Sequence, residues 1–338
     1  MKRAWRYGVV GSLVFLLAAW LVSPLVQAAY AQQLYPVMTN LLVPITSLIP
    51  FSLSAVLVPV AVVGLLVSLT LMLKSTRRMV WLRRGLIALL LGYGWFVVAW
   101  GGNYERESVE TLLSLPEQSI GEAEVLELTH YFAEVVTENV DSSRDVSRAL
   151  ASVRTSLLRD LNTYGLNGVR LPPTVKMLPA GTLLTFGYAG VISPFTLEAH
   201  VDSGVTDTTK VSVGAHELAH VAGFAGEADT YLVSTLAGLK ADDRFARYSI
   251  ALGMFDRASA QLPSEARQEL ISALPTAAQE DYWAIQDAKR RYYRPALAQP
   301  LSGVYDTYLR SQGVSAGVSD YGRVIKLLIH AQEKGLLE

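Results

Sequence analysis

The stretch VSVGAHELAHVAGFAGEAD, residues 211–229, carries two histidines four residues apart, with a glutamate directly after the first. Four residues make about one turn of an α-helix, so His216 and His220 share one helix face and can reach the same metal ion. Glu217 then lies beside that ion, where it can accept a proton from an activated water. The flanking residues are uncharged and mostly small, whereas an exposed helix with an accidental HExxH match would carry more charge. The sequence therefore predicts a buried helix with a metal site and Glu217 as general base.

A catalytic zinc site takes three protein ligands and leaves the fourth position to water. The chain has no cysteine, so the ligands of a Zn²⁺ ion must be histidine or carboxylate. Gly223 and Gly226 mark a turn after the histidines, and the next helix begins with Glu227 and also carries Asp229. We expect Glu227 to be the third ligand because its side chain is longer and stands in the first turn. Asp229 is the alternative ligand, or a residue that holds a histidine ring.

Hydrolysis also needs a hydrogen-bond donor for the oxyanion. We expect Tyr248 to be this catalytic residue, because its segment closely follows the predicted Glu227 helix; Tyr305 is the alternative. For both tyrosines, packing in the core is the competing interpretation. Glu198, in the strand before the motif, is expected either to bind a substrate amine or to form a structural salt bridge, and His200 in that strand could border the cleft.

The first part of the chain has the composition of a membrane region. Residues 1–104 hold eight of the 29 basic residues and none of the 30 acidic ones. Its long uncharged stretches predict three transmembrane helices, since a spanning helix needs roughly 20 apolar residues. They are expected at about 7–26, 53–73 and 85–103. The first stretch has a rival interpretation as a signal peptide cleaved near residues 29–31, which read AYA.

Basic residues predict how these helices are oriented. Three precede the first helix, and five lie in 74–84, between the second and the third. Positively charged loops stay in the cytoplasm, so the N-terminus is expected there and residues 105–338 on the extracytoplasmic side. The loop 24–50 has no charge and is expected to lie in the membrane interface or to pack on the helices.

Residues 105–338 have the length and acidic character of a single domain outside the membrane. The predicted fold is mainly α, with a small sheet before the HExxH helix. Apolar residues three or four apart predict helices, and short apolar runs near prolines and glycines predict strands. The expected helices are 122–140, 142–161 and 321–334, and the expected strands are 174–178, 183–186 and 195–201.

Several segments resemble the bacterial membrane proteins grouped as the domain of unknown function 3810 family. These segments are 50–53, 193–199, 216–227, 245–249, 304–309 and 321–324. The resemblance covers nearly the whole chain. It implies a zincin-like α+β catalytic domain, that is, a zinc metallopeptidase-like domain of the gluzincin type. In related clans the third ligand opens a Glu-x-x-Ala-Asn or Glu-x-x-Ala-Asp pattern. This chain keeps Glu227 but has Thr230 and Tyr231 in place of the final pair.

These features together predict a membrane-bound zinc metallopeptidase whose partners are a peptide or protein substrate and the lipid bilayer. The substrate is expected to lie along residues 193–201 as an added strand. A zinc-binding sensor or assembly factor without catalysis is the alternative. A transporter is disfavoured because the apolar stretches contain no acid or histidine, and nucleic acid is excluded by the acidic second part. The sequence makes no prediction of oligomeric state.

Overall fold

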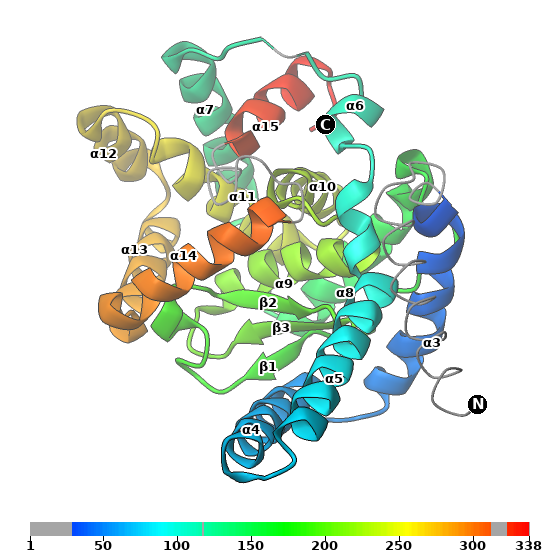
Figure 1. Ribbon diagram of the computed structural model, residues 1–338. Helices are drawn as coiled ribbons and strands as arrows, with labels where there is room; N and C mark the ends of the chain where they lie inside the picture. Colours follow the sequence, from blue (N-terminus) through cyan, green and yellow to red (C-terminus); the bar gives the residue numbers. More distant parts are fainter. Residues whose placement is uncertain (1–28, 117, 312–322, 338) are drawn as a thin grey trace.

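The computed structural model describes residues 29–116, 118–311 and 323–337. A hairpin of two long apolar helices projects from a mainly helical body that contains one small sheet (Figure 1). The mainly α architecture and the sheet ahead of the HExxH helix are confirmed. The predicted membrane helix at about 7–26 lies outside the described residues.

The hairpin consists of α4 (Leu53–Lys74) and α5 (Arg78–Ala99), which pack against each other. Within the described part of the chain, these two helices are long and apolar enough to cross a membrane. Each has 22 residues, or about 33 Å at 1.5 Å per residue, which matches a hydrocarbon core of about 30 Å. Almost all of their side chains are exposed, and α5 buries residues only in its last turn. Two of the three predicted apolar helices are therefore confirmed.

The segment before the hairpin is helical and packs against the body. A π-helix, η1 (Tyr30–Leu34), leads into α3 (Tyr35–Ser47), which contacts α5. The buried hydroxyl of Tyr35 donates a hydrogen bond of 2.7 Å to the carbonyl of Val221, at the end of the HExxH helix. Packing on the helices, one of the two expectations for residues 24–50, is therefore shown for the described part of that segment.

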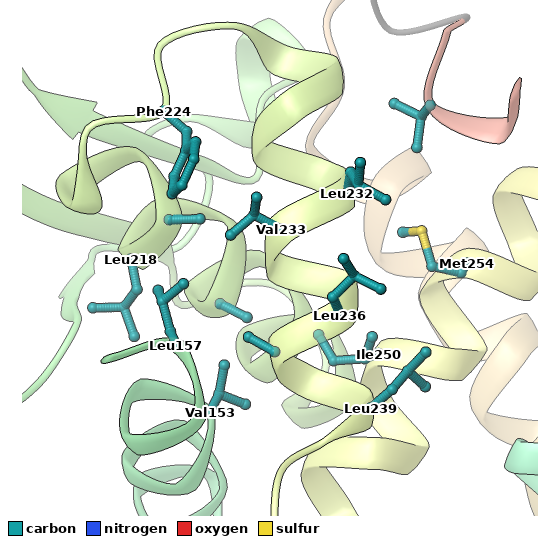
Figure 2. Packing of buried hydrophobic residues seen from close by; sticks show 14 of the residues in the cluster. Val153, Leu157, Leu218, Phe224, Leu232, Val233, Leu236, Leu239, Ile250 and Met254 are labelled. Atoms are coloured by element: carbon teal, nitrogen blue, oxygen red, sulfur yellow. The ribbon is translucent and has the colours of Figure 1, made fainter. Parts of the chain in front are cut away.

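The body is built around one central helix, α10 (Glu227–Leu239), eleven of whose residues are buried. Figure 2 shows its leucines between Val153 and Leu157 of α8 on one side and Ile250 and Met254 of α11 on the other. A helix that is apolar on most of its surface is a core helix, which is its place here. The remaining α-helices of the body are α6 (Val109–Leu112), α7 (Glu122–Asn139), α8 (Val146–Asp160), α9 (Asp207–Ala222), α11 (Arg244–Ser259), α12 (Ser264–Ala273), α13 (Thr276–Tyr292), α14 (Pro295–Ser311) and α15 (Arg323–Glu333). Short 3-10 helices lie at η2 (Gly101–Glu105), η3 (Leu161–Tyr164) and η4 (Leu184–Phe186).

The sheet has three short strands in the order β1-β3-β2. These strands are β1 (Lys176–Leu178), β2 (Gly190–Ser193) and β3 (Glu198–Asp202). The central strand β3 is parallel to β1 and antiparallel to β2, and all five of its residues are buried. The helix α9 packs on β3 and β2. A substrate was predicted to lie along residues 193–201, but residues 198–201 of this stretch belong to β3, which is paired on both sides. The edge strands of the sheet are β1 and β2.

The predicted strand 183–186 is wrong, since residues 184–186 form the 3-10 helix η4. The cause is the buried carboxylate of Asp202, which accepts backbone N–H groups of Gly181, Leu183 and Leu184 at 2.8–3.2 Å. Gly181 has a φ of 85°, a conformation that favours glycine. A long-range contact therefore bends a segment whose apolar run favours a strand.

One buried ion pair joins the hairpin, α3 and the sheet. The carboxylate of Glu198 on β3 accepts the backbone N–H groups of Leu53 and Ser54, both at 2.9 Å, at the start of α4. It is also paired with Lys176 of β1, whose ammonium donates to the carbonyl of Thr46 in α3 and to those of residues 49 and 51. Glu198 was expected either to bind a substrate amine or to form a structural salt bridge, and the structure shows the salt bridge.

Candidate metal centre

The turn between α9 and α10 brings the candidate ligands together. Gly223 ends α9 with a φ of 108°, and a Cβ atom there would lie 2.9 Å from the ring of Tyr35. Glycine meets both constraints because it has no side chain. After this short turn α10 begins at Glu227, so its first turn folds back beside α9. The glycines that mark the turn in the sequence thus determine the position of the third ligand.

Three buried side chains offer one donor atom each to a common point. The Oε2 atom of Glu227 lies 3.1 Å from Nε2 of His216 and 3.6 Å from Nε2 of His220. All three donor atoms lie within 4.8 Å of one another. Zinc bonds of about 2.0–2.1 Å in a tetrahedron separate neighbouring ligand atoms by about 3.3 Å. The donor set and its spacing therefore fit a zinc ion.

The ring of His220 is held in the orientation that a metal ligand needs. Its Nδ1 donates a hydrogen bond of 2.7 Å to the carbonyl of Phe224, and the hydroxyl oxygen of Thr230 lies 3.3 Å from the same nitrogen. With the proton on Nδ1, the lone pair of Nε2 points toward His216 and Glu227. Thr230 also donates to the carbonyl of Gly226 at 2.7 Å, so the same residue holds the turn.

Glu217 is buried beside the three candidate ligands. Among the described residues its Oε2 atom has no hydrogen-bond partner. Burial raises the pKa of Glu217 to about 8. A Cβ atom on Gly190 of β2 would lie 2.6 Å from Oε1 of Glu217, so the strand passes in direct contact with this carboxylate. At this pKa the carboxyl is mostly protonated at neutral pH, and a cation held by the neighbouring donors would favour its ionised form. The unused oxygen is then placed to take up and release a proton.

The electrostatics of Glu227 are those of an anionic ligand. Burial raises the pKa of its carboxyl, but hydrogen bonds and charge attraction from His216 and His220 outweigh burial and hold it well below 4.5. The carboxylate is therefore ionised at neutral pH, as binding to a cation requires.

A large cleft opens onto these residues. It has a volume of about 1270 Å³, which exceeds the roughly 300–1,000 Å³ of most small-molecule pockets. The edge strand β2 and the helices α10 and α11 line it, together with Trp100 at the end of α5 and Tyr104 of η2. The Trp100 ring lies edge-on to His220, with ring centroids 6.2 Å apart. The α4–α5 hairpin thus leads directly into the wall of the cleft.

The structure brings His216, Glu217, His220 and Glu227 together as predicted, but it does not bring Tyr248 to them. Tyr248 is buried outside the cleft lining, and its hydroxyl donates a hydrogen bond of 2.6 Å to Asp281. The side chain of the alternative, Tyr305, lies outside the described residues.

Asp229 and His200 also lie elsewhere. Asp229 accepts a hydrogen bond of 3.0 Å from the backbone N–H of Val109. His200 is buried away from the cleft lining, with its Nε2 2.8 Å from the hydroxyl of Ser52. Asp229 was expected to lie beside a histidine ring, but Thr230 is the residue that lies beside the ring of His220.

Two tyrosines of the cleft were not predicted from the sequence. The ring of Tyr231 contacts the ring of His216, with centroids 4.1 Å apart, and Tyr188 lines the cleft before β2. Burial raises the pKa of both hydroxyls, so they stay protonated as hydrogen-bond donors. Tyr231 follows Glu227 by four residues, one helical turn, and that spacing is a signal in the sequence.

Comparisons with known proteins give one result. No curated protein matches this chain, and no solved structure does. A family model described as "Protein of unknown function (DUF3810)" matches residues 30–329, from the start of η1 to α15. The match includes the hairpin, the candidate metal centre and the cleft, and so the chain belongs to the DUF3810 family.

Proposed function

We propose that this protein is a membrane-bound, zinc-dependent metallopeptidase. The observation that carries the proposal is the convergence of His216, His220 and Glu227 on one point, with the Glu217 carboxylate beside them at a large cleft. Zinc bound there supplies a Lewis acid that activates water and polarises the peptide carbonyl.

Glu217 is the general base in this proposal. Its Oε2 accepts the proton lost by the attacking water and returns it to the leaving amine, which leaves a carboxylate and an amine as products. The ligand His220 keeps its orientation through Nδ1 and the Phe224 carbonyl, so its side chain does not need to reorganise during the reaction.

The substrate is proposed to be a peptide in extended form. Val191 of the edge strand β2 lines the cleft and is 42% exposed, so a peptide can pair with this strand through its backbone. Such pairing places the peptide next to Glu217, because β2 passes that residue at Gly190. Tyr188 and Tyr231 replace Tyr248 as the proposed donors to the oxyanion.

The site is proposed to lie outside the cytoplasm. Both ends of the α4–α5 hairpin join the body, so the whole body lies on one side of the membrane if the hairpin spans it (Figure 1). The five basic residues of 74–84 lie at the opposite end of the hairpin, and positive charge favours the cytoplasm.

The test uses the full chain purified in detergent, with zinc quantification and a peptide-library cleavage assay. We expect about one zinc per chain, and we expect Glu217→Gln to keep the zinc while losing about 10²- to 10⁴-fold in rate. The matched control is Glu269→Gln, on the exposed surface of α12, which should behave as wild type. Zinc without turnover in the wild type would support the non-catalytic alternative instead, and absence of zinc would overturn both.

A further inference from the structure

Arg257, in the last turn of α11, lines the same cleft as the candidate metal centre. Its guanidinium carbon lies 4.0 Å from the centroid of the Tyr231 ring. That same ring contacts His216, at 4.1 Å between centroids. One aromatic ring therefore touches both a candidate zinc ligand and a cation of the cleft.

Arg257 has no anionic partner within the part of the chain that the structure describes. Its Nε atom is buried and makes no hydrogen bond among these residues. Arg257 as a whole is partly buried in the wall of the cleft, so its other N–H donors can meet a ligand there. Contact with Tyr231 supplies only a cation–π interaction, which leaves the planar N–H donors unused.

The neighbouring acid does not neutralise this guanidinium. Asp256 accepts hydrogen bonds from Arg267 and Gln286 on one oxygen, and it is paired with Lys289 at 2.8 Å on the other. Arg257, Arg267 and Lys289 all line the cleft, so this end carries three cations around one carboxylate. Three cations around one carboxylate leave an excess of positive charge there, and such an excess attracts a ligand of the opposite sign.

We propose that Arg257 binds a carboxylate of the peptide substrate, an inference that rests on the proposed peptidase function. A guanidinium binds a carboxylate through two parallel N–H···O bonds, which also fix its orientation. Since one ring contacts both groups, Arg257 lies within about 8 Å of the His216 ring, a span of about two extended peptide residues. The carboxylate therefore belongs one or two residues from the bond that is cleaved.

Binding to the full-length Glu217→Gln protein tests this without turnover. Three fluorescent peptides of otherwise neutral sequence serve as probes: one with a free C-terminus, one amidated, and one amidated with a glutamate near the C-terminus. We expect a carboxylate peptide to bind about 10- to 100-fold more tightly than the neutral amidated one. The free-acid probe identifies a C-terminal carboxylate as the ligand, and the glutamate probe identifies an acidic side chain.

Arg257→Ala, added to this protein, should abolish the preference and leave the neutral peptide within about twofold of its original affinity. The matched control is Arg290→Ala, an exposed arginine of α13 paired with Asp287, which should keep the preference. Arg257→Lys keeps the positive charge and should recover part of the preference for carboxylate peptides. This variant also tests the proposal if the alanine variant does not fold. An equal loss for all three peptides, or no preference with Arg257 present, would overturn the proposal. The wild-type protein could bind no zinc and cleave no peptide while still preferring carboxylate peptides through Arg257. That result would overturn the proposed peptidase function and retain the carboxylate site.

Discussion

Gly190 determines how closely β2 approaches the candidate general base. A methyl group there would lie 2.5 Å from Val213 Cγ1 and 2.6 Å from Glu217 Oε1, so one of them must move. We expect Gly190→Ala to keep zinc and to lose activity on the order of 100-fold, the usual effect of misplacing a catalytic group by about 1 Å. The measurement is kcat/KM on a cleaved peptide together with zinc content.

Gly253 provides the matched control for this substitution. It also lines the cleft, but its added methyl would meet the Cβ atom of Ser212 at 3.5 Å, an ordinary contact. Gly253→Ala should therefore keep full activity. Full activity in Gly190→Ala would show that the position of Glu217 is not critical.

Thr230 is expected to tune the affinity for zinc through the His220 ring. Thr230→Val removes the hydroxyl that bonds the Gly226 carbonyl and lies beside His220 Nδ1. Removing such a group typically weakens metal binding about 10- to 100-fold. Competition with a zinc chelator measures this, and Thr230→Ser, which keeps the hydroxyl, should bind as wild type. Equal affinities for the valine variant and the wild type would contradict the assignment.

The convergence of the three candidate ligands could be predicted because local spacing on two helices determines it. His216 and His220 are one turn apart, and Glu227 begins the next helix after a glycine turn. The prediction for Tyr248 depended instead on which face of α11 lines the cleft. Ile250 and Arg257 line the cleft, and Tyr248, two positions before Ile250, lies on the other side of that helix. Packing between distant helices sets that face, and the sequence of one helix does not reveal it.

At the scale of elements, the start of α4 is held by Glu198, and this contact should contribute strongly to stability. We expect Glu198→Gln to lower the free energy of unfolding by about 3–5 kcal/mol, because it leaves the buried ammonium of Lys176 without its anion. Thermal unfolding in detergent measures the change. The matched control is Asp287→Asn, whose ion pair with Arg290 is exposed and should contribute about 0–1 kcal/mol.

The pH dependence of this effect has a definite sign. Burial raises the pKa of Glu198, but its bonds to Lys176 and to the backbone of α4 outweigh burial and lower it below 4.5. The stabilisation is then present above the unfolded pKa of about 4.3 and is lost as pH falls through the folded value. The difference between wild type and Glu198→Gln should therefore be constant near neutral pH and shrink below about pH 4. A difference that grows on acidification would contradict this account.

Periodic helices such as α7, α8 and α15 could be predicted because each buries one apolar stripe. The helix α3 has no such contrast between an apolar and a polar face. One face packs on the body, and the outer residues Val37, Leu41 and Ile45 are also apolar, although they are more than half exposed. The strand β2 was missed because only four residues between turns form it, and its identity comes from pairing with β3. Both features depend on tertiary contacts that no local pattern records.

At the scale of the whole molecule, the hairpin makes sidedness testable. The chain contains no cysteine, so single cysteines can report which side of the membrane a residue occupies. We expect Thr76→Cys, in the turn between α4 and α5, to react with an impermeant maleimide only after the membrane is permeabilised. Gln268→Cys, exposed on α12, should react while that membrane is intact, and the wild type is the unlabelled control. The reversed pattern would place the candidate metal centre in the cytoplasm.

The candidate membrane helix α5 is followed directly by its C-cap residue Trp100, whose ring lies edge-on to the ring of His220 in the cleft wall. A transmembrane helix tilts when the thickness of its bilayer changes. Because no linker separates the last turn of α5 from Trp100, such a tilt acts directly on the surroundings of a candidate zinc ligand. If α5 spans the membrane, we expect lipid chain length to alter zinc affinity and activity, and nanodiscs of defined thickness are the medium in which to compare this protein with its variants.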